Sequence, residues 1–253
     1  KEGDPIPATQ SHQKKITNAI RNRLPEWIDG VIKPVIQAAL DADGLTAKLT
    51  IAGELNDKLI LDYPEVKTGT GYSAPTVLLE FGARATGEPH DFHEVGCDMA
   101  PLIDGVVFPS ARPLVMAVER TFWEKATAAH VFCLQGRLRG DRYSRHWYDL
   151  AAISQSAHYR SAAGDSALAK AVAEHKSMYF SEKDAQGGKV DYFAAVSGHL
   201  QLIPEGDSLV ALERDYAAMV ADGLLPIDQP DFESIIERCR IIQDEVNKRN
   251  GLI

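Results

Sequence analysis

Residues 118–154 constrain the fold of this chain more than any other stretch, because they contain two helix-forming segments joined by a short basic connector. The first segment has no glycine or proline between Leu114 and Gln135, is rich in alanine, and repeats its apolar residues at helical spacing. The second follows Ser144, a residue type that favours the N-cap of a helix. We therefore expect two helices, with these residues on their inner faces: Val118, Phe122, Ala126 and Ala129 on the first, and Trp147, Leu150, Ala151 and Ser154 on the second.

Three polar residues in this stretch are not explained by solubility alone. Lys125 stands beside Phe122 and Ala129, where a helix that needed only a core would carry leucine. Arg145 and Asp149 are four positions apart and share one face of the second helix. Spacing alone favours a simple alternative, in which the lysine is solvated and Arg145 and Asp149 form a surface ion pair.

The two helices carry the motifs T-F-W-E-K-A and S-R-H-W-Y-D-L, in that order. This pairing resembles the AbiEii/AbiGii toxin family, nucleotidyltransferases of bacterial toxin–antitoxin and phage-defence systems. Their later motifs are E-K-x-x-A on one helix and R-H-x-x-D-L on another, which match residues 124–126 and 145–150 here. The resemblance continues through A-E-H-K-S-M-Y-F and L-E-R-D-Y-A-A-M, so it covers nearly the whole chain from about Ser11.

The first part of the chain has a helical segment followed by strands. We expect the helix to begin with Ser11 as its N-cap, to be broken into two or three pieces by Pro25 and Pro34, and to end at Gly44. A broad apolar stripe runs along it, and three strand patterns follow, in L-T-A-K-L-T-I-A, K-L-I-L-D-Y and P-T-V-L-L-E-F. The stripe is formed by Ile16, Ile20, Leu24, Trp27, Ile28, Val31, Val35 and Leu40.

The connections between these strands are too short for parallel crossovers, so a mostly antiparallel sheet beside a helix is expected. The predicted fold class is α+β: a partial nucleotidyltransferase-like antiparallel or mixed sheet with helices, followed by an all-helical C-terminal domain. We place the first domain at residues 1–113 and the second at 114–253, with helices at 167–180, 208–221 and 232–249. Residues 85–113 are expected to form a loop that docks across the sheet.

Glu80 ends the third strand, in the sequence V-L-L-E-F-G-A-R. Alternation puts its side chain on the face of Thr76 and Leu78, so a solvent-exposed carboxylate is one interpretation. The resemblance implies another, in which Glu80 is the third carboxylate of a two-metal nucleotidyl-transfer site. Mg²⁺ suits such a site because it prefers hard oxygen ligands and substrate phosphates. Arg84 would then lie near the phosphates, or simply on the surface.

The resemblance also implies roles for the motif residues. Lys125 would contact the triphosphate of an NTP and stabilise developing negative charge, and Asp149 would orient that lysine or the acceptor. Arg145 would bind phosphate bidentately, and His146 belongs with Arg84 and Arg145 to the predicted substrate-binding residues. The implied partners are an NTP with Mg²⁺, a tRNA or other RNA acceptor as in some family members, and a cognate antitoxin protein.

The opening motifs of the family are not found in the sequence. A G-[GS]-[ST] turn should hold the triphosphate, and a D-x-D pair on the next strand should bind both metals. The pair Gly187-Gly188 lies far downstream of Glu80, and Asp41-Ala42-Asp43 fits a turn that ends a helix. Because the sequence begins with Lys1 rather than Met, we expect a fragment that binds nucleotide weakly and does not catalyse alone.

Composition and charge argue against several further classes of protein. The formal charge of −9 over 253 residues argues against tight, non-specific nucleic-acid binding by the whole surface. It leaves room for a local basic groove from Arg137, Arg139, Arg142 and Arg145. Three scattered cysteines without C-x-x-C spacing support neither a disulfide framework nor a zinc cluster. No apolar run approaches the ~20 residues that cross a bilayer, so we expect a cytoplasmic protein without a membrane span.

Three functions are therefore consistent with the sequence. The first is a metal-dependent nucleotidyltransferase toxin held in check by an antitoxin. The second is a non-catalytic module of the same fold that binds nucleotide, RNA or a protein partner, which the missing D-x-D favours if the gene starts near residue 1. The third is a metal hydrolase using His90 and His93, which lack the H-E-x-x-H order and stand in a loop bounded by proline and glycine.

Overall fold

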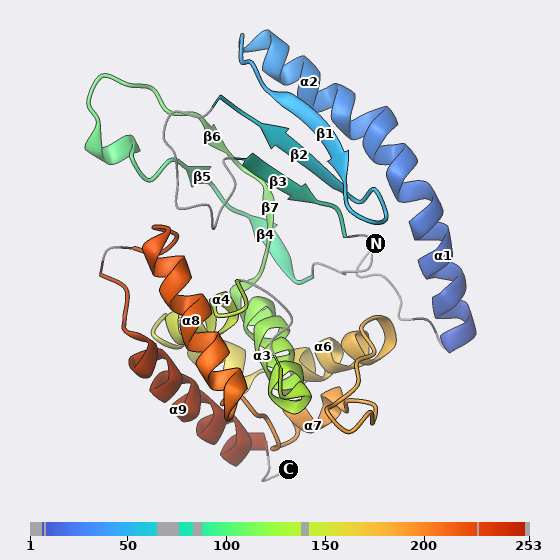
Figure 1. Ribbon diagram of the computed structural model, residues 1–253, viewed down its shortest axis with the longest axis vertical. Helices are drawn as coiled ribbons and strands as arrows, with labels where there is room; N and C mark the ends of the chain where they lie inside the picture. Colours follow the sequence, from blue (N-terminus) through green and yellow to red (C-terminus); the bar gives the residue numbers. More distant parts are fainter. Residues whose placement is uncertain are drawn as a thin grey trace. The chain divides into compact units, whose positions relative to one another are not determined.

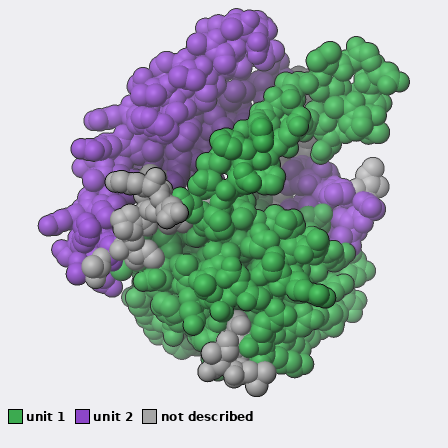
Figure 2. Space-filling view, turned by 180° about the vertical axis from the view of Figure 1, so that it is seen from behind, with its two compact units in different colours: residues 1–3, 87–210, 231–253 green, residues 4–86, 211–230 purple. Residues whose placement is uncertain are grey.

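The computed structural model of the 253-residue chain describes Pro7 and residues 9–64, 76–82, 88–137, 142–226 and 228–250. The chain divides into two compact units, shown in green and purple in Figure 2, which are described separately. The sheet unit comprises residues 4–86 and 211–230, and the helical unit comprises residues 1–3, 87–210 and 231–253. This division follows spatial contacts, whereas the boundary expected after residue 113 follows motifs, so that boundary stays a prediction.

The sheet unit has a small antiparallel sheet with a long helical segment along it (Figure 1). The strand order is β1-β2-β3, and both neighbouring pairs are antiparallel, which confirms the predicted α+β class. The elements are α1 (Gln10–Trp27), a π-helical turn (Ile28–Ile32), α2 (Lys33–Ala42), β1 (Lys48–Ala52), β2 (Lys58–Asp62) and β3 (Thr76–Glu80).

The core of the sheet unit lies between these helices and one face of the sheet. Ile28, Leu49 and Leu59 are its buried centre. The helical side chains packed against it recur every four residues and are Leu24, Ile32, Ile36 and Leu40. The predicted stripe was therefore too broad: Trp27, Val31 and Val35 are exposed, because a single helix can turn only one face toward a three-stranded sheet.

Two details of the helical segment differ from the expectation or refine it. Thr9 rather than Ser11 is the N-cap of α1, and its hydroxyl accepts the backbone N–H of His12 at 3.2 Å. Pro34 cannot donate to the carbonyl four residues earlier, and the turn before it is π-helical, with Lys33 N–H bonded to Ile28 O. The three helical pieces are thus continuous rather than separate.

The helical unit is built around α3, which contacts α4, α5, α6 and α7. Its helices, in chain order, are α3 (Val118–Gln135), α4 (Arg145–Ser154), α5 (Tyr159–Gly164), α6 (Ser166–Tyr179), α7 (Tyr192–Val196) and α9 (Phe232–Asn250). A further helix, α8 (Asp207–Ala221), begins in this unit, and its residues from 211 belong to the sheet unit. No helix of the described ranges is long and apolar enough to cross a bilayer.

Helix α3 has an almost wholly buried apolar side. Phe122, Trp123 and the expected Ala126 and Ala129 have no exposed surface. The Trp123 indole N–H donates to the carbonyl of Ala162 at 2.9 Å, so this large ring is buried without an unsatisfied donor. The helix ends at Gly136, whose positive φ of 62° suits a residue without a Cβ.

The segment before α3 is a hairpin rather than the expected irregular loop. Strand β4 (His90–Phe92) pairs with β7 (Leu114–Met116), and β5 (Val95–Gly96) pairs with β6 (Ser110–Ala111) further along, with a 3₁₀ turn (Ala100–Leu102) between them. The prediction failed because these strands are only two or three residues long, too short for an alternating pattern to appear in the sequence.

The core assignment of the sheet unit is testable by truncating one side chain. Ile28→Ala removes a fully buried side chain and should lower the free energy of unfolding by about 2–5 kcal/mol. Val35→Ala, on the same helical segment but 64% exposed, is the matched control and should change it by less than about 0.5 kcal/mol. Urea unfolding followed by circular dichroism measures both. Equal losses would contradict the core described above.

Candidate functional site

Lys125 and Asp149, predicted as a pair of site residues, are in direct contact in the helical unit. Lys125 Nζ donates to Asp149 Oδ2, which joins the middle of α3 to the middle of α4. The side chains are 23% and 35% exposed, so a ligand can reach both. Arg145 is exposed and forms no ion pair with any described residue, so the simple alternative of a surface Arg145–Asp149 pair is wrong. Asp149 holds the lysine instead.

A second ion-paired group lies one residue away on α3. The Glu124 carboxylate accepts from Arg120 Nη2 at 2.9 Å and from Lys176 Nζ of α6 at 2.6 Å. Arg120 also donates through Nη1 to the carbonyl of Glu88, at 2.7 Å, just before the hairpin. Burial alone would raise the pKa of Glu124, but its two ion-paired cations lower it below the ordinary value. Glu124 is therefore ionised and joins α3 to α6.

His146, on the same helix as Asp149, is uncharged. Burial, and then the positive charges of Lys125, Arg145 and Lys176, lower its pKa to about 3. The ring contacts those of Phe132 and Tyr143, and its buried Nδ1 has no hydrogen-bond partner in the part of the chain that the structure describes. At neutral pH the predicted substrate-binding histidine cannot act as a cation, although a neutral imidazole can still form hydrogen bonds.

The charges of the side chains around Glu124, Lys125 and His146 do not cancel. Arg120, Lys125 and Lys176 pair with the two carboxylates of Glu124 and Asp149, and a fourth cation, Arg145, precedes His146 on α4 and also lowers the pKa of its ring. The cluster therefore carries a surplus of two positive charges in a chain with a formal net charge of −9. A local positive field of this kind attracts anionic ligands even when the whole protein is acidic. We call these four cations and two carboxylates the cationic cluster.

Glu80 lies in the other unit, at the end of edge strand β3. Its carboxylate is 59% exposed and pairs with Lys58 Nζ on the neighbouring strand at 2.5 Å. A single carboxylate already held by an ammonium group is not a Mg²⁺ site, because that ion is bound by several oxygen ligands. The residues described around Glu80 therefore do not fit the metal by themselves. Its convergence with Lys125 and Asp149 stays a prediction, and Arg84 lies outside the described residues.

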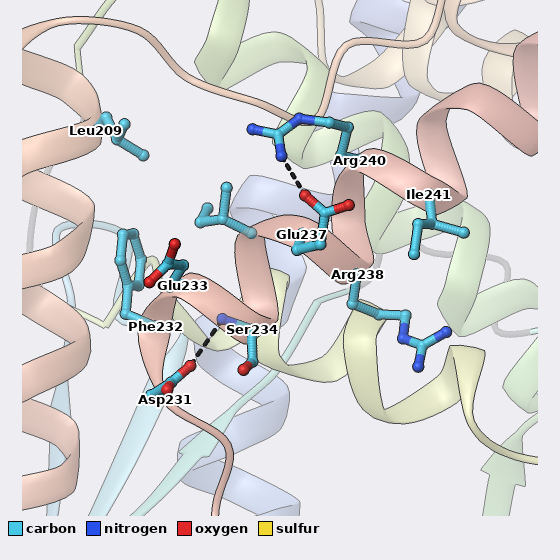
Figure 3. A pocket seen from close by; sticks show the side chains of 10 residues that line it. Leu209, Asp231, Phe232, Glu233, Ser234, Glu237, Arg238, Arg240 and Ile241 are labelled. Atoms are coloured by element: carbon cyan, nitrogen blue, oxygen red, sulfur yellow. Dashed lines mark hydrogen bonds and ion pairs between the residues drawn. The ribbon is translucent and has the colours of Figure 1, made fainter.

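Two other places in the chain lack the residues of the predicted site. Within the described ranges, no three His, Cys, Asp or Glu side chains come together to hold a metal ion, and His90 and His93 are exposed. A cavity of about 610 Å³ lies at the start of α9, but none of the predicted site residues lines it. Its charged groups are partly satisfied by each other, as Arg240 pairs with Glu237 (Figure 3).

Sequence reasoning did not select Arg120, Glu124 and Lys176 as site residues. Glu124 belongs to the E-K-x-x-A motif, and the A-E-H-K-S-M-Y-F segment contains Lys176, so both were within matched motifs. A lysine on a helix such as α6 usually belongs to a solvated polar face, whereas the Lys176 side chain is only 15% exposed. The pairing with Glu124 spans 52 positions of sequence, and neither residue's own spacing reveals such a contact.

The fold and the cationic cluster define an α+β protein whose helices carry a positively charged group of side chains. The chain matches the family model described as "Nucleotidyl transferase AbiEii toxin, Type IV TA system" over residues 8–238, so it belongs to the AbiEii family of nucleotidyl transferase toxins. A toxin of such a toxin–antitoxin system has an antitoxin as its counterpart. No curated protein and no solved structure matched the chain.

The neutral state of His146 predicts a pH dependence of stability. Its folded-state pKa of about 3 lies below the ordinary value of 6.5, so on acidification the unfolded chain takes up the proton first. Stability present at pH 7 is therefore lost as the pH falls. His146→Leu should reduce the loss in unfolding free energy between pH 7 and pH 5 by about 2 kcal/mol. Urea titrations at the two pH values measure this, and equal losses in wild type and variant would show that the folded ring is protonated.

Proposed function

We propose that this protein transfers a nucleotide from a nucleoside triphosphate to an acceptor, and that Lys125 binds the triphosphate. The observation that carries the proposal is the contact between Lys125 and Asp149, which brings the E-K-x-x-A and R-H-x-x-D-L motifs together from two helices. Membership of a nucleotidyl transferase family supports the reaction class.

The geometry fits the electrostatic needs of this reaction. In-line attack on the α-phosphate builds negative charge on the phosphate oxygens, and a cation that is already in place stabilises it without reorganisation. Lys125 is such a cation, because the carboxylate of Asp149 fixes its otherwise flexible side chain. Arg145, at the start of α4 and exposed, offers a planar guanidinium that suits a phosphate oxygen pair. Asp149 acts by orienting the lysine.

We propose Mg²⁺ as the cofactor, with Glu80 as one ligand, on the basis of the family resemblance. An RNA acceptor is supported by exposed Arg137, Arg142 and Arg145 around the connector between α3 and α4, a local basic surface on an acidic chain. We also propose that the antitoxin is a cognate protein.

A non-catalytic binding module of the same fold is the alternative. One observation favours it: the sequence contains no G-[GS]-[ST] turn followed by a strand with D-x-D. Both functions need the cationic cluster for nucleotide binding, so mutations there do not separate them. Turnover does: incubation of the full-length gene product with labelled NTPs and total tRNA should yield labelled RNA if it is an enzyme, and bound but unconverted NTP if it is a module.

The Lys125–Asp149 contact predicts a non-additive double-mutant cycle. Lys125→Ala in the full-length protein should abolish toxicity, and Asp149→Ala should do so nearly as completely, because an unheld lysine loses its position. Since Asp149 acts through Lys125, the double variant should be no worse than Lys125→Ala alone. Transferase rate and growth inhibition on induction measure the three variants.

The fold is the control for this cycle. The pair is partly exposed, so its loss should lower stability by no more than about 1 kcal/mol, and melting temperatures should fall only slightly. Full toxicity of Lys125→Ala would remove the lysine from the mechanism. An Asp149→Ala protein that stays toxic but melts much earlier would show that the pair is structural.

A further inference from the structure

Lys176 is a largely buried cation. It shares the carboxylate of Glu124 with a second cation, so this carboxylate does not neutralise both charges. It stands on α6, which packs against α3, and its side chain is only 15% exposed. Its ammonium group lies 2.6 Å from Glu124 and 4.9 Å from the centre of the Phe180 ring. The aromatic face adds a modest attraction, and it also confines the lysine to one side of the helix.

Glu124 does not need Lys176 for neutralisation. Arg120, with only 4% of its surface exposed, already pairs with the same carboxylate at 2.9 Å. Within the described part of the chain, these two cations around one carboxylate leave one positive charge without a counter-ion in a partly desolvated place. Such an arrangement costs free energy in the ligand-free protein, and a bound anion offsets the cost.

Lys176 and the predicted triphosphate-binding lysine are held on the same turn of α3. Glu124 and Lys125 are consecutive residues, and each is paired with a residue of another helix: Glu124 with Lys176 of α6, and Lys125 with Asp149 of α4. The positive charges of both lysines also act on the His146 ring, where they add to the effect of burial in lowering its pKa.

We propose that Lys176 is a second phosphate-binding residue of the site, which makes the site selective for polyphosphate over single-phosphate ligands, and that Glu124 is a positioning residue that holds Lys176 in place. The proposal rests on the proposed function, because it assumes that Lys125 binds the same ligand. It assigns α6 a direct part in substrate binding, in addition to the two helices that carry the matched motifs.

Inorganic tripolyphosphate and orthophosphate are suitable probes, because neither contains a nucleobase and their binding is independent of any base preference. Isothermal titration of the chain should show that Lys176→Ala weakens tripolyphosphate binding about tenfold and changes orthophosphate binding by less than twofold. Lys176→Arg, which keeps the charge, should retain most of the affinity. Lys170→Ala removes a positive charge from an exposed position of the same helix and is the matched control, expected to leave both affinities unchanged.

The variant Glu124→Gln distinguishes a role of Glu124 in positioning Lys176 from a purely electrostatic effect of its negative charge. Removing a carboxylate beside an anion site should tighten tripolyphosphate binding by electrostatics alone, whereas loss of the positioning contact should weaken it severalfold. Tighter binding by this variant would overturn the role of Glu124. Circular dichroism and melting curves confirm that each variant is folded, and the Lys176 variants test the proposal even if Glu124→Gln does not fold.

The outcomes separate this inference from the proposed function. If Lys125→Ala loses tripolyphosphate binding and Lys176→Ala binds like wild type, the inference is wrong and the proposed function stands. If wild type binds no tripolyphosphate at millimolar concentration, both are wrong. Equal loss in Lys176→Ala and Lys170→Ala would show a general charge effect rather than a contact, and would also overturn the inference.

Discussion

The burial of α3 determines what its polar residues can do. Phe122 and Trp123 have no exposed surface, and α3 packs against several helices of its unit, so a charged side chain next to them cannot simply extend into water. A charge that is taken out of water is tolerated when it is paired and hydrogen-bonded. Glu124 and Lys125 meet this condition through partners on two different helices, α6 and α4. The packing of α3 thus holds both ion pairs in place and also fixes the geometry of the cationic cluster.

This double role explains how an acidic protein can present a cationic site. The formal net charge is −9, yet the cluster holds four cations and two carboxylates. Ion pairs on the open surface contribute little and are screened by salt, whereas pairs at the edge of a core are held in one geometry. A preorganised cation is what phosphoryl chemistry requires of a protein. The family is one of nucleotidyl transferases, and the lysine at its motif position is held in place by Asp149. These two observations are therefore consistent.

The sequence predicted the long elements well and the long-range contacts poorly. The bounds of α3, α4 and the three strands of the sheet were close, because helical spacing and alternation are local signals. Thr9 and Ser11 are both residue types that cap helices, so residue type alone does not choose between them. The exposure of Trp27 on an apolar stripe depends on which face of the helix meets the sheet. No local pattern contains that information.

The candidate site shows the same contrast between local patterns, which the sequence contains, and long-range contacts, which it does not. Lys125 and Asp149 were selected through a family resemblance, and their contact decided against the i, i+4 pair of Arg145 with Asp149 that spacing favoured. Lys176 was passed over because a lysine on an amphipathic helix is usually solvated, and only the packing of α6 on α3 shows that it is not. Glu80, by contrast, has the exposed, alternating position that the strand pattern predicts, and its role in metal binding stays a prediction.

The most direct test of the central claim is a crystal structure of the protein with a non-hydrolysable nucleoside triphosphate. Our account predicts phosphate oxygens within about 3.2 Å of Lys125 Nζ, with Asp149 still holding the lysine from α4. A triphosphate bound at another surface, with the Lys125–Asp149 pair untouched, would contradict it.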